Sequence, residues 1–331
     1  MSKIKKYFLL LCSLLILLVI TGGWWLFARH DIYPASILVE SGDPLYKVVV
    51  KLHDRDIVSS PWIFSKVGIL VGLDKKIIPG RYDFNTRVSN FDIMRKLWRG
   101  DIAVMSITVP EGYSLNKISD LLYQRCGVNQ QRFDSLTRDS QFLLTLGIDA
   151  GFAEGYLYPE TYRFAWGVSA AEAIEAMTHQ LFSNIDETMK ARAEELGYSL
   201  DDLLTMASIV ELEGAVPDEY PTIASVYRNR LDINMLLQAD PTVIYAMGGL
   251  DRQLLQKDYK FPSTYNTYLH KGLPPTPICS PGLDAIMAAL YPAQTDYLYF
   301  VADGSGRHVF NSTYRQHLID TRRIKRTMRG S

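Results

Sequence analysis

The chain has 331 residues, 47% of them hydrophobic and 21% charged, with a formal net charge of −1. This length exceeds one small domain, and the composition supports a globular body with a core of ordinary size. The body carries no long basic block, which argues against electrostatic binding to nucleic acid. Cysteine and histidine pairs at metal-binding spacing and glycine-rich nucleotide loops are absent from the sequence, so we expect neither a metal nor a cofactor.

An uncharged segment of 22 residues, 7–28, lies near the N-terminus. As a helix it spans roughly 33 Å, enough to cross a hydrocarbon layer of about 30 Å. Lys3, Lys5 and Lys6 precede it, and this positive charge predicts a cytoplasmic N-terminus and an outward-facing body. Residues 1–31 are therefore expected to be a cytoplasmic end and a single-pass anchor. A cleaved signal peptide is the alternative, although Gly-Gly-Trp-Trp is a poor cleavage site; a buried core helix is the least favoured reading.

Residues 32–104 are expected to form a small α+β module. Apolar positions between Leu45 and Leu52 recur at helical spacing. The Pro-Gly-Arg-Tyr turn at 79–82 leads into a strand in which Tyr82 and Phe84 alternate. A second helix is expected between the cap Ser89 and Gly100, with apolar residues Phe91, Ile93, Met94, Leu97 and Trp98.

Residues 105–331 are expected to form a mainly helical domain that ends in a β-hairpin. Helical periodicity dominates to about residue 231. Two strand-like runs near 297–302 and 307–310 flank Asp-Gly-Ser-Gly, which predicts the hairpin. The basic tail after residue 321 is interpreted as a solvated terminus. The predicted fold class is thus α+β throughout, with an N-terminal transmembrane helix.

Two cysteines, Cys126 and Cys279, lie in the body. An oxidising compartment would allow a disulfide between them. Two separate buried thiols are the favoured interpretation.

Glu211 is the candidate acid/base. Ser199 and Asp202 have the form of a capping box, which predicts a helix running to Glu213. That helix is apolar over most of its surface, and Glu211 shares a stripe with Leu204 and Ala207. Burial favours the neutral form of a carboxyl group, as required of an acid that protonates a glycosidic oxygen at neutral pH. The structural alternative is an ion pair between Glu211 and an arginine such as Arg228 or Arg230.

Polar loops follow this helix, and they carry Gln238, Asp240, Tyr265 and Asn266. Such side chains can donate and accept hydrogen bonds with sugar hydroxyls, and tyrosines can stack on sugar rings. Each could equally serve a turn, and Asp240 in particular could cap its loop.

Several motifs in a fixed order resemble one known family. They are ASIVExE at 207–213, IASVxxNRL at 223–231, LQxDPTVIY at 237–245, YNTY at 265–268 and GLPPxPI at 272–278. Upstream and downstream of them stand VPEG at 109–112, EGYLYPETY at 154–162 and YLYFVADGxGxHxF at 297–310. Over residues 105 to 320 the chain resembles the endolytic murein transglycosylase, or YceG-like, family. The first module resembles the LysM-like subdomain of these proteins through its PGRY turn.

The resemblance implies a lyase of bacterial peptidoglycan glycan strands, anchored in the inner membrane with its body on the periplasmic side. Glu211 matches the catalytic glutamate; it would protonate the bond between N-acetylmuramic acid and N-acetylglucosamine and then deprotonate the muramic 6-hydroxyl, giving a 1,6-anhydro end. Gln238, Asp240, Tyr265, Asn266 and Glu213 are expected to contact substrate. Glu213 faces away from Glu211 on the same helix, so it is not expected to act as a second catalytic carboxylate. Coupling to peptidoglycan synthases is a further expectation.

Two positions depart from the family pattern. Gly214 stands where threonine usually follows the second glutamate, and Thr276 stands where glycine is commoner. These changes bear on fine specificity more than on reaction class. The alternatives are a muramidase that uses water and a non-enzymatic peptidoglycan-binding scaffold, with a metal-dependent hydrolase least favoured.

Overall fold

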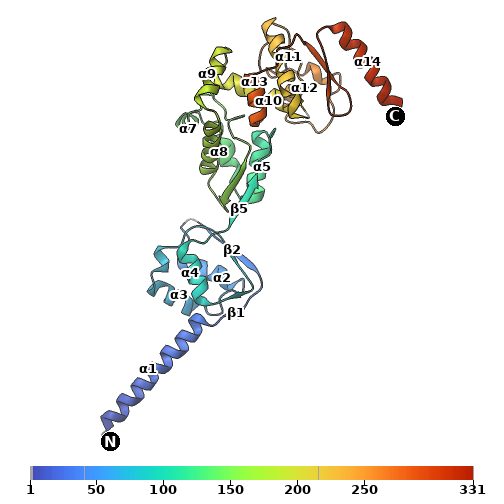
Figure 1. The fold of residues 1–331 in the computed structure, drawn as a ribbon. Helices are drawn as coiled ribbons and strands as arrows, with labels where there is room; N and C mark the ends of the chain where they lie inside the picture. Colours follow the sequence, from blue (N-terminus) through green and yellow to red (C-terminus); the bar gives the residue numbers. More distant parts are fainter. Residues whose placement is uncertain (1–2, 41, 215, 331) are drawn as a thin grey trace. The chain divides into compact units, whose positions relative to one another are not determined.

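The computed structural model describes residues 3–40, 42–214 and 216–330. The chain divides into two compact units. The first comprises residues up to Met105 together with Arg163–Val168, and the second comprises Ser106–Tyr162 and the residues from Ser169 onward. Figure 1 colours them from blue at the N-terminus to red at the C-terminus.

The N-terminal helix α1, Lys3–Phe27, contains a candidate membrane span at Lys5–Phe27 with a mean hydropathy of 2.3. None of the most apolar window is buried within the structure, so the interpretation as a buried core helix is wrong. The last turn of α1 packs on the module. Trp25 and Leu26 lie against its core, and Asn90 Nδ2 donates a hydrogen bond to the Trp25 carbonyl oxygen at 2.9 Å.

The module in the first unit is α+β, as predicted. Its elements are β1 (His30–Asp31), β2 (Ala35–Val39), α2 (Leu45–His53), α3 (Pro61–Leu70), the 3-10 turn η1 (Leu73–Lys75), β3 (Gly80–Phe84), β4 (Arg87–Val88) and α4 (Asn90–Arg99). β1 pairs antiparallel with β4, and β2 with β3. The apolar positions predicted on α2 are all buried, and the strand buries Tyr82 and Phe84.

Helix α4 begins and ends where the sequence predicts. Ser89 forms a capping box with Asp92, and Gly100 ends the helix in a left-handed conformation, φ +65°. Its predicted apolar set is split, because Ile93, Met94 and Leu97 are buried whereas Phe91 and Trp98 stay partly exposed. α4 therefore presents an apolar surface beyond the module core.

Strands β5 (Val104–Thr108) and β6 (Thr161–Ala165) form a two-stranded sheet, and the division between the two units falls within these strands. The assignment of residues 163–168 to the first unit was not visible in the sequence.

The second unit is mainly helical and carries the hairpin β7 (Tyr299–Ala302) and β8 (His308–Asn311), as predicted. Its helices are α5 (Leu115–Cys126), α6 (Gln130–Leu136), α7 (Ser140–Thr145), α8 (Ala170–Asn184), α9 (Glu187–Glu195), α10 (Leu200–Glu213), α11 (Tyr220–Asp232), α12 (Asp240–Ala246), α13 (Leu283–Leu290) and α14 (Tyr314–Gly330), with 3-10 turns η2 (Pro217–Glu219) and η3 (Asp258–Lys260). Helix α10 packs against α11, α12 and α13, and Figure 1 shows α10, α12 and α13 together. Its residues Leu203–Val210 are all buried.

One detail of the second unit differs from the sequence interpretation. Asp240 was placed in a loop, but it is the first residue of α12, because Pro241 fits the first turn of a helix. The basic tail forms the helix α14, and its residues Arg322, Arg323, Lys325 and Arg326 are exposed, as expected of a solvated terminus. Cys126 and Cys279 are separate, buried free thiols, which confirms the favoured interpretation.

Candidate active site

Glu211 lies in the last turn of α10, half-buried, with both carboxylate oxygens engaged. Gly282 N–H donates to Glu211 Oε2 at 2.9 Å, and Tyr220 O–H donates to Oε1 at 3.2 Å. Neither Arg228 nor Arg230 forms an ion pair with it in the described part of the chain. Arg228 pairs with Asp232, and Arg230 donates to backbone carbonyl oxygens. The arginine-paired alternative is therefore wrong.

Two glycines allow these contacts. Gly214 follows α10 in an extended conformation, and a Cβ there would lie 2.3 Å from the Tyr220 ring. The helix thus ends without a left-handed cap, and the glycine is required for the close approach of Tyr220. At Gly282 a Cβ would lie 2.0 Å from Glu111 Oε1. Gly282 therefore lies between the carboxylates of Glu111 and Glu211, and both can approach its backbone because it has no side chain.

Glu111 is the site residue that the sequence interpretation missed. It belongs to the turn Pro110-Glu111-Gly112, which is joined to the loop before α13 by two backbone hydrogen bonds. Gly112 N–H donates to the Ser280 carbonyl oxygen at 2.9 Å, and Ser280 N–H donates to the Tyr113 carbonyl oxygen at 2.8 Å. The position of Glu111 in the VPEG motif was a signal that it could serve the site. The sequence did not show that it lies near Glu211, which is 100 positions further along the chain.

The electrostatics favour a protonated Glu211. Burial raises the pKa of Glu211, and the negative charges of Glu111 and Asp284 raise it further, while the hydrogen bonds from Gly282 and Tyr220 oppose the shift. The pKa of Glu111 is itself raised by partial desolvation and by Asp284. Glu211 therefore holds its proton more strongly than a free glutamate does, and the hydrogen bonds from Gly282 and Tyr220 still stabilise its carboxylate once the proton has left.

Glu213 belongs to a second polar cluster on another side of α10. Tyr227 O–H donates to Glu213 Oε1 at 2.7 Å, and desolvation raises the pKa of Glu213 to about 7. The nearby charge of Asp240 also favours the protonated form. Asp240 accepts hydrogen bonds from Tyr268 O–H at 2.6 Å and from Tyr259 O–H at 3.4 Å. The structure thus brings Glu213 and Asp240 together.

The remaining predicted site residues have different environments. Gln238 is exposed, with a left-handed backbone, φ +49°, and its N–H donates to the Thr267 carbonyl oxygen. Tyr265 is half-buried with its ring against Tyr245. Asn266 is fully buried; its Nδ2 donates to two carbonyl oxygens of its own loop and its Oδ1 accepts from Tyr268 N–H. Its amide is therefore committed to holding this loop together.

A cavity of about 160 Å³ lies between Gly112, which follows Glu111, Leu212, which follows Glu211, and the helix α12. Gly112, whose Cβ position is 3.9 Å from Glu211 Cγ, lines it together with Lys117, Leu212 and Tyr245. Glu154 is buried nearby, where it accepts from Leu115 N–H and Tyr245 O–H, and burial raises its pKa to about 7. No group of three metal-ligating side chains suited to an ion is found among the described residues.

A family model described as the YceG-like family matches residues 37–323. The chain belongs to the YceG-like family. It is 33% identical over 298 residues to the endolytic murein transglycosylase of Bacillus subtilis (strain 168), covering 85% of this chain and 82% of that protein. It is 30% identical over 258 residues to the endolytic murein transglycosylase of Streptococcus pneumoniae serotype 2, covering 68% of this chain but 46% of the relative. A crystal structure of a yceG-like protein from Listeria monocytogenes superposes with a TM-score of 0.62 at 30% identity, covering 86% of this chain and 98% of that one.

The two positions expected to depart from the family pattern, Gly214 and Thr276, both have local contacts. Gly214 makes room for the Tyr220 ring that reaches Glu211. Thr276 Oγ1 lies 2.8 Å from Tyr265 Oη and donates to the Pro277 carbonyl oxygen. Thr276 therefore contacts Tyr265, a residue predicted to bind substrate.

Proposed function

We propose that this chain is a membrane-anchored endolytic lytic transglycosylase of peptidoglycan, in which Glu211 acts first as acid and then as base. Its relatives are named endolytic murein transglycosylases. The observation that carries the proposal is the half-buried Glu211 carboxyl between Tyr220 and Gly282, beside two carboxylates that favour its protonated form.

The proposed reaction balances with one proton carrier. The Glu211 carboxyl protonates the oxygen between N-acetylmuramic acid and N-acetylglucosamine, and the bond from that oxygen to muramic C1 breaks. Positive charge develops at C1, and the nearby charges of Glu111 and Asp284 favour it. The Glu211 carboxylate then takes the proton of the muramic 6-hydroxyl as O6 bonds to C1. Glu211 ends protonated again, and the product carries a 1,6-anhydro end.

The second step depends on a stabilised carboxylate. After Glu211 gives up its proton, Gly282 N–H and Tyr220 O–H can still donate to its two oxygens. Hydrogen bonds to the charged form lower the cost of that state. Because the substrate supplies the nucleophile, the reaction needs no activated water.

The anchor and the polar loops complete the proposal. The helix α1 is long and apolar enough to span a membrane, and the lysines before it favour a cytoplasmic N-terminus. The catalytic body would then face the periplasm, where nascent glycan strands emerge, and cleavage there would terminate their elongation. Exposed Gln238, Tyr265 and the pair Glu213 and Asp240 are the groove residues we propose. Contact of the LysM-like module with glycan and coupling to peptidoglycan synthases remain proposals based on the family.

Product analysis tests the mechanism. Full-length wild type, Glu211→Gln and the control Glu175→Gln, which changes an exposed carboxylate of α8, would be incubated with purified glycan strands. We expect new ends lighter than reducing ends by one water for wild type and control, and a loss of about a thousandfold or more for Glu211→Gln. Reducing ends alone, or unchanged release by Glu211→Gln, would overturn the proposal.

A water-using muramidase is the second candidate, because Glu111 places another carboxylate near Glu211. Glycosidases that hydrolyse their substrates use such pairs, one carboxyl as acid and one as base or nucleophile. Cleavage in water enriched in ¹⁸O separates the two mechanisms. Incorporation of the label at the new muramic C1 would favour the muramidase, and an unlabelled anhydro end would favour the transglycosylase.

A further inference from the structure

The first unit carries an exposed apolar helix face that its own core does not use. Helix α3 has the sequence Pro-Trp-Ile-Phe-Ser-Lys-Val-Gly-Ile-Leu, with Lys66 as its one charged residue. Phe64 and Gly68 face the core, whereas Trp62, Ile63, Ile69 and Leu70, together called the α3 face, are exposed. Leu70 is 85% exposed and Trp62 is 72% exposed. Ten residues span about 15 Å, which is too short to cross a bilayer.

The α3 face is continuous with the anchor helix. A groove of about 330 Å³ is lined on one side by Leu18, Thr21 and Gly22 of α1, and on the other by Ile63 and Val67 of α3. Leu18 lies about 15 Å along the helix axis before the end of the apolar segment. A helix α1 that crosses the membrane would therefore place the α3 face at the depth of the outer leaflet.

The apolar surface continues onto α4. A second groove, of about 320 Å³, is lined by Leu26, Val71, Phe91 and Trp98, among others. Lys76 Nζ lies 4.2 Å from the centre of the Trp98 ring. Tryptophan beside a basic side chain is typical of the boundary between acyl chains and headgroups, where the ring is apolar and the cation remains hydrated.

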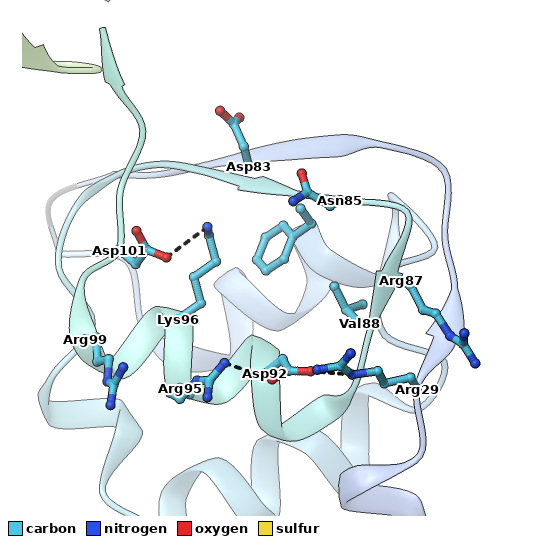
Figure 2. A pocket seen from close by; sticks show the side chains of 11 residues that line it. Arg29, Asp83, Asn85, Arg87, Val88, Asp92, Arg95, Lys96, Arg99 and Asp101 are labelled. Carbon is cyan, nitrogen blue, oxygen red and sulfur yellow. Dashed lines mark hydrogen bonds and ion pairs between the residues drawn. The ribbon is translucent and has the colours of Figure 1, made fainter.

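Beyond this groove the surface becomes cationic. Arg95 lines the second groove and also a polar pocket of about 370 Å³, which has five basic and three acidic side chains in its lining. Figure 2 shows Arg99, Arg95, Asp92 and Arg29 in a row along this pocket. Asp92 is shared by Arg95 at 3.0 Å and Arg29 at 3.5 Å, so positive charge is in excess. Arg29 stands two residues after the end of α1.

We propose that the first unit is partly embedded in the outer leaflet, with the α3 face among the upper acyl chains and the Arg29–Arg95–Arg99 row against anionic lipid headgroups. An interfacial helix binds lipid through its buried apolar area, and basic residues next to it add attraction to anionic lipids. This second contact would fix the module against the membrane, whereas α1 alone would leave it free to rotate. The proposal rests on α1 crossing the membrane.

Site-specific quenching in vesicles tests it on the full chain. In a Cys12→Ser background the two remaining cysteines are buried, so a fluorophore can be attached at Ile69→Cys. Leu144→Cys on α7 is the matched control, because Leu144 is 57% exposed and Ile69 is 55% exposed. Val19→Cys in α1 reports whether the anchor is inserted. The quencher for Ile69 and Leu144 is a nitroxide on the upper acyl chain of phosphatidylcholine, with or without phosphatidylglycerol. The quencher for Val19, which lies near the bilayer centre, is a nitroxide near the end of the acyl chain.

We expect quenching at Ile69 to be about threefold or more above that at Leu144, with strong quenching at Val19. Quenching at Val19 without quenching at Ile69 would overturn the embedding and leave the anchor intact. No quenching at Val19 would overturn both. Equal quenching at Leu144 and Ile69 would overturn the proposal in favour of nonspecific adsorption. A change in Ile69 fluorescence that depends on the number of protein chains per vesicle, and not on the quencher lipid, would overturn it in favour of contact with a second copy of the chain.

A separate measurement tests the proposed contact of Arg29, Arg95 and Arg99 with anionic lipid. Phosphatidylglycerol should increase quenching at Ile69, and the combined variant Arg29→Gln, Arg95→Gln and Arg99→Gln should lose that increase while Val19 stays quenched. If the increase persists in the variant, these three arginines do not bind the anionic headgroups, and that part of the proposal is wrong.

Discussion

Replacing Glu111 with glutamine tests the electrostatic account of the site most directly. The variant keeps the size and a carbonyl oxygen of the side chain but removes its charge. Glu211 should then lose one of the negative neighbours that raise its pKa. The protonated form of Glu211 would persist over a narrower pH range.

The geometry sets the size of this effect. Glu211 Oε2 accepts from Gly282 N–H at 2.9 Å, and a Cβ on Gly282 would lie 2.0 Å from Glu111 Oε1. With standard backbone dimensions, the two carboxylates are at most about 7 Å apart. Two unit charges at that distance interact by about 2 kcal/mol at an effective dielectric constant of about 20. Because Glu111 is exposed, solvent screens the pair, and we expect the pKa of Glu211 to fall by about one unit.

The measurement is the pH profile of kcat/KM for cleavage of purified glycan strands. Its alkaline limb reports loss of the proton from the catalytic acid in the free enzyme. In Glu111→Gln this limb should move down by about one pH unit, so activity on the limb falls about tenfold while activity at acidic pH is kept. Glu175→Gln should leave the profile unchanged.

Two outcomes would refute this reasoning. An alkaline limb that does not move would show that the charge of Glu111 does not act on Glu211. A loss of about a thousandfold at every pH would show that Glu111 takes part in bond making, as in a hydrolase with two carboxylates.

Three further predictions concern other residues of the second unit. Gly214→Ala should clash with the Tyr220 ring, destabilise the fold by about 1–3 kcal/mol and lower kcat, measured by urea unfolding and by turnover; full retention of both would contradict the close approach. Burial raises the pKa of Glu154 to about 7, above its unfolded value, so stability present at acidic pH is lost as the pH rises towards 7. Glu154→Gln should make the decline smaller by about 3 kcal/mol between pH 4 and 7, and Glu213, whose pKa is also raised to about 7, should leave a remaining decline. Urea midpoints that fall equally in both proteins would argue against this prediction. Cys126 and Cys279 should react with a thiol reagent only after unfolding, and rapid reaction in the native protein would contradict their burial.

The structure confirms features of the sequence that are encoded locally. The helix cap at Ser89, the capping box at Ser199, the buried face of α2 and the C-terminal hairpin depend on residues within a few positions of one another. Asp240 was misplaced because a polar residue before proline suits both a loop and the first turn of a helix.

By itself, the sequence determined an apolar segment long enough to cross a membrane and a helix that carries Glu211. Its ordered motifs also indicated membership of the YceG-like family. Only the tertiary structure decided what surrounds Glu211. Glu111 and Gly282 lie 100 and 71 positions from Glu211, and the backbone hydrogen bonds between Gly112, Tyr113 and Ser280 bring them together. The same holds for Glu213 beside Asp240 and for α3 beside α1. Periodicity and capping report which face of an element is apolar, but the partner of that face depends on contacts between segments distant in the chain.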